Sequence, residues 1–120
     1  MSSGPVPSTL YRLGDLGQCK SGMKVRFLGC VDNYDVKGGA LRLKHQYPAS
    51  SPLSTVHVNI VHVLERLKRH ELDVGTWLNV IGYVGRHERA LFVQAVAVWD
   101  AGDVDVEAYE KAVDERKPCT

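Results

Sequence analysis

The feature that most constrains the fold is a long alternating stretch with a glycine at its centre. It spans residues 24–34, and its inward positions are Val25, Phe27, Gly29 and Val31, which alternate with mostly polar neighbours. A glycine in the middle of a strand is typical of a bulge or a sharp bend. We therefore expect one long strand that bends near Gly29 and contributes to two sheets.

Further alternating stretches follow and predict strands over residues 40–47, 55–60, 77–84 and 91–99. A turn signal at 37–39 predicts a hairpin between the first two strands, and a charged connection at 86–89 joins the last two. Apolar residues at helical spacing predict one short helix over 61–72. The expected inward residues are Leu41, Leu43, His45, Tyr47, Val56, Val58, Ile60, Leu78, Val80, Gly82 and Val84, with Leu91, Val93, Ala95, Ala97 and Trp99 sharing one face of the last strand.

The element order is three strands, a helix and two strands, with a bent first strand. This is the order of the OB-fold, a five-stranded Greek-key barrel with a helix between strands three and four. Another small barrel, such as an SH3-like one, is the alternative. A chain of 120 residues is long enough for one domain. We divide it into an N-terminal arm with a short apolar segment (1–21), the barrel (22–101) and a C-terminal helix (103–117).

The C-terminal helix needs a surface to pack on, because a helix of this length is marginal in water alone. Strands four and five also need cover, since their second faces are apolar. Either the chain's own segments or a partner protein covers them, and the sequence leaves both open. The helical stripe is Val106, Tyr109, Ala112 and Val113, with Arg116 in the last turn, and the apolar second faces include Ile81, Tyr83 and Phe92. Tyr109 is our candidate for the central interface residue, because a large ring with a polar tip suits that position.

Charge is spread unevenly along the chain. Residues 100–120 carry seven acidic and three basic side chains, a net charge of −4, and residues 1–99 therefore carry +5. This asymmetry suggests two different partner surfaces. Arg26, on the polar side of the first strand, is a candidate for an acidic partner residue or a phosphate, and a solvated strand arginine is the alternative.

A nucleic-acid surface is predicted on strands two and three, where OB-folds place their ligands. Its candidate residues are Arg42, Lys44, His57 and Asn59, flanked by Lys37, Arg86 and Arg89. The cations would neutralise phosphates, so binding should weaken with salt. Aromatic platforms are sparse there, so we expect weak affinity for single strands. The alternative is that these charges only keep a sheet face soluble.

Several other functions find little support. Motifs such as GxSxG, GxxxxGK[ST] and GxGxxG are absent, so no catalytic residues are predicted. Three cysteines without CxxC spacing indicate reduced thiols, and no metal site or cofactor is expected. We predict no membrane span and no targeting segment, because apolar stretches are short and the first nine residues lack an apolar core.

Four segments, in order and spacing, resemble the Ten subunit of the CST telomere-capping complex, particularly its filamentous-fungal members, over nearly the whole chain. They are Gly22-x-x-Val25-Arg26-Phe27-Leu28-Gly29-x-Val31-x-x-Tyr34, Trp77-Leu-Asn-Val-Ile-Gly-Tyr-Val84, Val93-Gln94-Ala95-x-x-Val98-Trp99 and Tyr109-Glu-Lys-Ala-x-x-Glu115-Arg116. The resemblance implies a nuclear, telomeric, non-enzymatic OB-fold subunit. It implies pairing with the N-terminal OB-fold of the Stn subunit, with a C-terminal helix from each partner, as in the two smaller subunits of replication protein A.

Through the Stn subunit, the resemblance also implies contact with the large CST subunit and with DNA polymerase alpha–primase during fill-in. The complex would protect chromosome ends and bind their G-rich single strand, this chain contributing weakly or only within the complex. A general single-stranded nucleic-acid-binding OB module, resembling the small subunit of replication protein A, is the alternative function.

Overall fold

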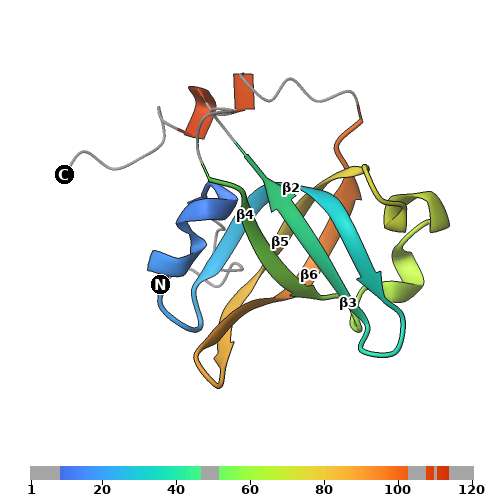
Figure 1. Ribbon diagram of the computed structural model, residues 1–120, viewed down its shortest axis with the longest axis horizontal. Coiled ribbons are helices and arrows are strands. Elements are labelled where there is room, and N and C mark those ends of the chain that lie inside the picture. The colour runs from blue at the N-terminus through green and yellow to red at the C-terminus, as the bar shows by residue number, and fades with distance from the viewer. Residues whose placement is uncertain (1–8, 47–51, 103–107, 110, 114–120) are drawn as a thin grey trace, which may run out of the picture.

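A closed five-stranded barrel forms the body of the chain (Figure 1). The computed structural model describes residues 9–46, 52–102, 108–109 and 111–113. Around the barrel the strands run β2 (Lys24–Asp35), β3 (Ala40–His45), β4 (Ser54–Asn59), β6 (Ala90–Asp100) and β5 (Trp77–His87), and β5 pairs back onto β2. A sixth, two-residue strand, β1 (Thr9–Leu10), lies parallel to β2 on its outer edge. The predicted barrel and its five strands are confirmed, and β1 is a strand that the sequence did not predict.

The predicted bend in the first strand is confirmed. The first half of β2 pairs with β5 and the second half with β3, and the change of partner falls at Cys30, one residue after Gly29. A Cβ at Gly29 would lie 2.9 Å from the Cβ of Leu43, so only glycine permits this approach of β3. The bulge itself lies slightly later, between Val31 and Asn33.

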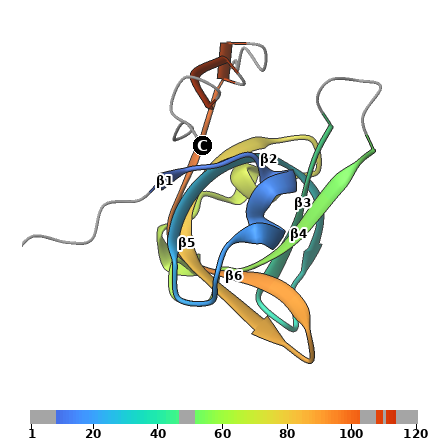
Figure 2. The same cartoon turned by 90° about the vertical axis from the view of Figure 1, so that its left-hand side faces the viewer.

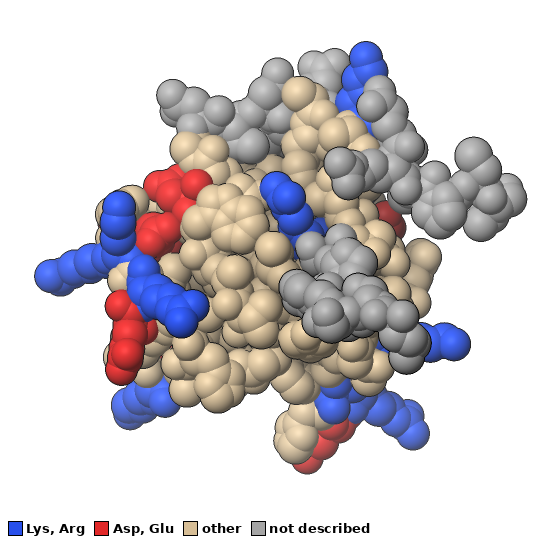
Figure 3. Space-filling view, turned by 180° about the vertical axis from the view of Figure 1, so that it is seen from behind, with Lys and Arg blue, Asp and Glu red and all other residues tan. Residues whose placement is uncertain are grey.

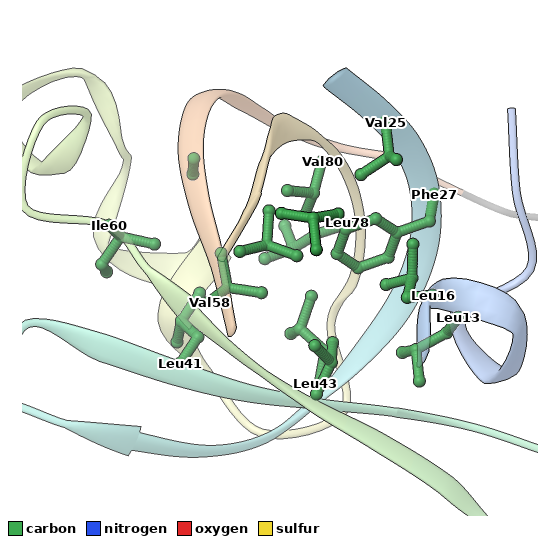
Figure 4. Packing of buried hydrophobic residues seen from close by; sticks show 14 of the residues in the cluster. Leu13, Leu16, Val25, Phe27, Leu41, Leu43, Val58, Ile60, Leu78 and Val80 are labelled. Carbon is green, nitrogen blue, oxygen red and sulfur yellow. The ribbon is translucent and has the colours of Figure 1, made fainter. Parts of the chain in front are cut away.

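The core fills the barrel and is closed at one end by a short 3₁₀ helix, η1 (Leu13–Gln18). η1 packs against β2, β3 and β4 and lies across the barrel opening in Figure 2. Figure 4 shows Leu13 and Leu16 reaching from η1 towards the side chains of the strands. The fully buried residues of this cluster include Leu16, Val25, Phe27, Val31, Leu41, Leu43, Val58, Ile60, Leu78, Val80, Val93 and Ala95.

The helix predicted over 61–72 is wrong in type. Two 3₁₀ turns, η2 (Leu64–Arg66) and η3 (Arg69–Leu72), occupy the segment, and the backbone between them is extended at Leu67 and Lys68. The apolar residues recur every three positions, which is the period of a 3₁₀ helix rather than of an α-helix. The predicted buried stripe is wrong too, because Val61 is 55% exposed while Val63 is buried.

The last strand also differs from the prediction. β5 and β6 are joined by a two-residue turn at Glu88 and Arg89, both with positive φ, as in a type I′ hairpin. Farther along, Gly82 pairs with Ala95 and Ile81 with Ala97, so Val96 is an extra residue without a partner. This bulge reverses the alternation.

As a result, the five residues predicted to share one face of the last strand are divided between two. Val93 and Ala95 point into the barrel, whereas Ala97 and Trp99 point away from it. The residue that packs on the core after the bulge is Val98.

Candidate partner and nucleic-acid surfaces

The outer face of β2, β5 and β6 carries the apolar residues that the sequence left uncovered. The strand register places Arg26 beside Ile81, with Tyr83 and Trp99 in the neighbouring rows of the same face. We call this region the apolar face, and define it by Arg26, Ile81, Tyr83, Val96 and Trp99. Tyr83 and Val96 are each 39% exposed and Trp99 is 37% exposed. Seen from behind (Figure 3), the molecule shows broad areas of uncharged side chains between scattered charges.

Arg26 is a cation within the apolar face, and Lys24 pairs with Tyr83 at its edge. Its guanidinium carbon lies 5.4 Å from the centre of the Trp99 ring, which is cation–π geometry. Phe92 lies farther along β6, with its ring over Gly85, where an added Cβ would be 2.5 Å from the ring. The structure therefore brings Arg26, Ile81 and Tyr83 together and places Phe92 at one end of the same strand pair.

The C-terminal segment is helical at residues 108–109 and 111–113, in agreement with the predicted helix; Val106, Arg116 and the rest of 103–117 lie outside the described residues. Tyr109 is half-buried, and its hydroxyl contacts the backbone of Leu28 and Tyr11. Val113 is fully buried, whereas Ala112 is partly exposed. In the chain alone, the Tyr109 hydroxyl thus lies against the chain's own barrel and Val113 is buried, and contact of either residue with a partner stays a prediction.

Leu28 explains why the C-terminal segment docks where it does. Its neighbours Phe27 and Val31 belong to the barrel core, but Leu28 does not, although it is fully buried. Something outside the barrel must therefore cover its side chain, and the Tyr109 hydroxyl sits on its backbone N–H. The C-terminal segment therefore covers the outer side of β2 at Leu28. The apolar face, farther along the same outer side, stays exposed.

A shallow groove of about 440 Å³ lies on the opposite side, over β2, β3 and β4. Of the predicted nucleic-acid residues, Arg42, His57 and Lys37 line it, together with Tyr34. Arg42 and His57 are cross-strand neighbours, as expected. Asn59 begins the next turn instead, because its Oδ1 accepts a hydrogen bond from the Val61 N–H at 3.0 Å.

One acid lies between Arg42 of this groove and Lys44, which lies beside the groove and does not line it. Asp32 is 2.6 Å from the Arg42 Nε and 3.5 Å from the Lys44 Nζ. The hydrogen bond from Arg42 is the main reason why the pKa of Asp32 is lowered from its usual value of 3.8. The positive charge of this side is therefore smaller than a count of lysines and arginines suggests.

Arg86 does not belong to this groove, which corrects the prediction. Its guanidinium donates to the carbonyl oxygens of Gly17 and Cys19 at 3.0 and 2.8 Å and approaches the Ser21 hydroxyl at 3.4 Å. Arg86 therefore ties the end of η1 to β5. Arg89 lies in the exposed turn between β5 and β6, and it does not line the groove either.

Sequence reasoning missed the role of two buried polar residues. Glu71 of η3 accepts hydrogen bonds from the backbone N–H groups of Lys68 and Asp100, both at 2.8 Å, and so holds the end of β6. His45 was expected to point inward and does, and its Nδ1 lies 3.2 Å from the Leu28 carbonyl oxygen. The alternation located His45 but gave no sign of its hydrogen-bond partner.

Two features of the described residues bear on other functions. Among them, no group of three or more His, Cys, Asp or Glu side chains gathers as a metal site would require. Within the same residues, no helix is long and apolar enough to cross a membrane.

The strand order, the cationic groove and the open apolar face together define an OB-fold binding subunit. The chain belongs to the Ten1 family, described as telomere capping, CST complex subunit, whose model matches residues 1–114. It is 34% identical over 110 residues to protein ten1 of Schizosaccharomyces pombe, covering 92% of this chain and 94% of that protein. The resemblance noted in the sequence is therefore confirmed.

Solved structures agree with this family and fold. A chain in the crystal structure of the S. pombe Stn1–ten1 complex matches with a TM-score of 0.73 and 29% identity, covering 98% of each chain. A chain of U. maydis replication protein A, solved bound to single-stranded DNA, matches with a TM-score of 0.61 and 23% identity, over 91% of this chain and 88% of that one. At that identity the second match shows the OB-fold alone.

Proposed function

We propose that this chain is a non-catalytic subunit that pairs with an Stn-type subunit at chromosome ends in the nucleus. The observation that carries this proposal is the open apolar face. The matched S. pombe relative was solved in complex with Stn1, which supports the same pairing here. End protection, contact with the large CST subunit and fill-in by DNA polymerase alpha–primase would then be functions of the assembled complex.

The exposure of the apolar face supports an obligate partner. Tyr83, Val96 and Trp99 lie on two adjacent strands and are all more than a third exposed. Contiguous apolar surface of this kind is typical of interfaces, and permanent interfaces are the more hydrophobic ones. Tyrosine, tryptophan and arginine are also the residues that dominate binding energy, and the apolar face holds one pair of them in contact, Arg26 and Trp99.

The C-terminal segment lies next to the apolar face and extends it. The Tyr109 hydroxyl holds the segment on the barrel, Val113 is buried, and Ala112 is left partly exposed. We infer that the partner contacts the outer side of this helix and the apolar face together. Tyr109 would then act on the partner by positioning the helix, and Val106 and Arg116 remain predicted contacts.

The groove over β2, β3 and β4 supports a contribution to single-strand binding. Arg42, Lys44 and His57 would contact phosphates, and Asp32 would reduce the affinity of the chain alone. We expect weak binding of a G-rich single strand by the isolated chain, stronger binding by the complex, and a steep loss with salt.

Co-purification with the Stn-type subunit tests the pairing. We expect Val96→Asp and Trp99→Ala each to weaken the complex at least tenfold, because the first places a carboxylate in an apolar interface and the second removes the ring that Arg26 contacts. Val36→Asp is the matched control, since Val36 is 73% exposed but lies outside the apolar face. Full binding by both variants would reject the proposal. A chain that does not bind the Stn-type subunit, and whose size-exclusion elution as a monomer shifts when an oligonucleotide is added, would favour the general single-strand-binding module.

A further inference from the structure

A second pocket, separate from the groove, opens beside β5. Its volume is about 350 Å³, and it is lined by Cys30, Lys44, His45, Gln46, Leu53 and Trp77. The strand register explains how these residues meet, because Cys30 pairs with Lys44 on one side and with Trp77 on the other. Trp77 and Lys44 thus flank Cys30 across three adjacent strands, with backbones about 10 Å apart. The sequence pattern places Trp77 on the apolar second face of its strand, but Trp77 was not among the predicted site residues.

The Trp77 ring is held in place from within the fold. His45 meets it edge-on, with ring centres 5.3 Å apart and planes at 81°. On its other side, His45 contacts the Tyr109 ring at 6.1 Å, and its Nδ1 lies on the Leu28 carbonyl oxygen. A fixed aromatic ring that lines an open pocket loses little entropy when a flat ligand stacks on it.

The charge around the pocket favours an anionic ligand group next to the ring. Lys44 supplies the cation, and its contact with Asp32 is long, at 3.5 Å, and only partly buried. Such ion pairs near the surface are weak, so a phosphate can replace the carboxylate at little cost. Burial raises the pKa of the Cys30 thiol, which therefore stays neutral between the two side chains.

We propose that this pocket binds one nucleotide of a single strand, with the base stacked on Trp77 and its phosphate beside Lys44. The inference rests on the single-strand binding proposed above and deepens it. Lys44 lies between Trp77 and the groove, and Arg42 of the groove is two residues before Lys44 on β3. One nucleic-acid strand can therefore contact the pocket and the groove together. Stacking on a ring tolerates any base, because every base has a π-face. The pocket would supply the aromatic platform that the groove lacks.

Fluorine NMR tests the proposal. The chain is labelled with fluorotryptophan, which gives one signal each for Trp77 and Trp99, assigned with Trp77→Phe and Trp99→Phe. It is titrated with a G-rich single-stranded oligonucleotide at low salt, alone and in complex with the unlabelled Stn-type subunit. We expect the Trp77 signal to shift along the binding curve measured by fluorescence anisotropy, while the Trp99 signal stays in place.

Substitutions give an independent readout. Trp77→Ala should weaken oligonucleotide binding by about 5- to 150-fold, as expected for one lost stacking contact, whereas Trp77→Phe should keep most of the affinity. Leu64→Ala is the control, because Leu64 is 39% exposed and lines neither the pocket nor the groove. If the oligonucleotide binds to saturation and the Trp77 signal does not shift, the proposal of a base stacked on Trp77 is rejected, and the proposed single-strand binding is retained. Failure of both chain and complex to bind would overturn both.

Discussion

The Tyr109 hydroxyl accepts a hydrogen bond from the backbone N–H of Leu28 at 3.0 Å, across 81 positions of sequence. The same hydroxyl donates to the Tyr11 carbonyl oxygen at 2.8 Å. Tyr11 also donates its N–H to the Arg26 carbonyl oxygen, so in a regular parallel ladder Leu28 would donate directly to Tyr11. The phenol is therefore inserted between two strands where a backbone hydrogen bond would otherwise form. The C-terminal segment in this way covers the edge of β2 between β1 and β3.

Removal of this hydroxyl should destabilise the barrel. Tyr109→Phe leaves the Leu28 N–H and the Tyr11 carbonyl without their partner, and a partly buried group of this kind costs about 1–3 kcal/mol. Urea unfolding should show this loss, and amide exchange at Leu28 should accelerate. Tyr83→Phe removes an exposed hydroxyl and should change the unfolding free energy by less than about 0.5 kcal/mol. Equal losses in the two variants would show that the inserted hydroxyl contributes nothing.

The Glu71 carboxylate should anchor the end of β6. Both its oxygens accept backbone N–H groups, one of them from Asp100 at the end of β6. Glu71→Gln replaces one acceptor by a donor that faces an N–H group, so we expect a loss of about 1.5–3 kcal/mol in the unfolding free energy. Glu65→Gln, an exposed position in η2, is the matched control. An unchanged urea midpoint for Glu71→Gln would contradict this role.

How far the sequence predicts the fold depends on whether a strand has one wet face. β3 and β4 do, and the predicted inward residues Leu41, Leu43, Val56 and Val58 are all buried. β6 is apolar on both faces, so its sequence does not show which residues point into the barrel. For the same reason the bulge at Val96 could not be predicted from the sequence.

The candidate sites were partly predictable for a similar reason. Cross-strand neighbours such as Arg42 and His57 follow from register, and they do line one groove. The acceptors of Arg86 lie at residues 17–21, and they reach it only through tertiary packing. The positive charge of Arg86 gave no indication that its guanidinium would bind backbone carbonyl groups of the same chain.

Gly82 should be intolerant of any side chain. A Cβ there would lie 2.4 Å from the Gln94 carbonyl oxygen and 3.0 Å from the Ala95 Cα, both in the backbone of β6. Because the backbone cannot move aside without breaking the ladder, Gly82→Ala should cost about 1–3 kcal/mol or more. Gly17→Ala is the control, since nothing lies within 4 Å of its added Cβ. Thermal unfolding should separate the two, and equal midpoints would contradict the close approach.

The Asp32–Arg42 pair should make stability depend on pH in the acid range. The pKa of Asp32 is lowered in the folded chain, chiefly by the Arg42 hydrogen bond. The pair therefore stabilises the fold above the unfolded pKa, about 4, and this contribution disappears as pH falls through the folded value. Arg42→Ala should raise the pKa of Asp32 in a carbon NMR titration, and Lys44→Ala, whose cation lies 3.5 Å away, should raise it less. Equal shifts would show that distance from the carboxylate does not set the effect.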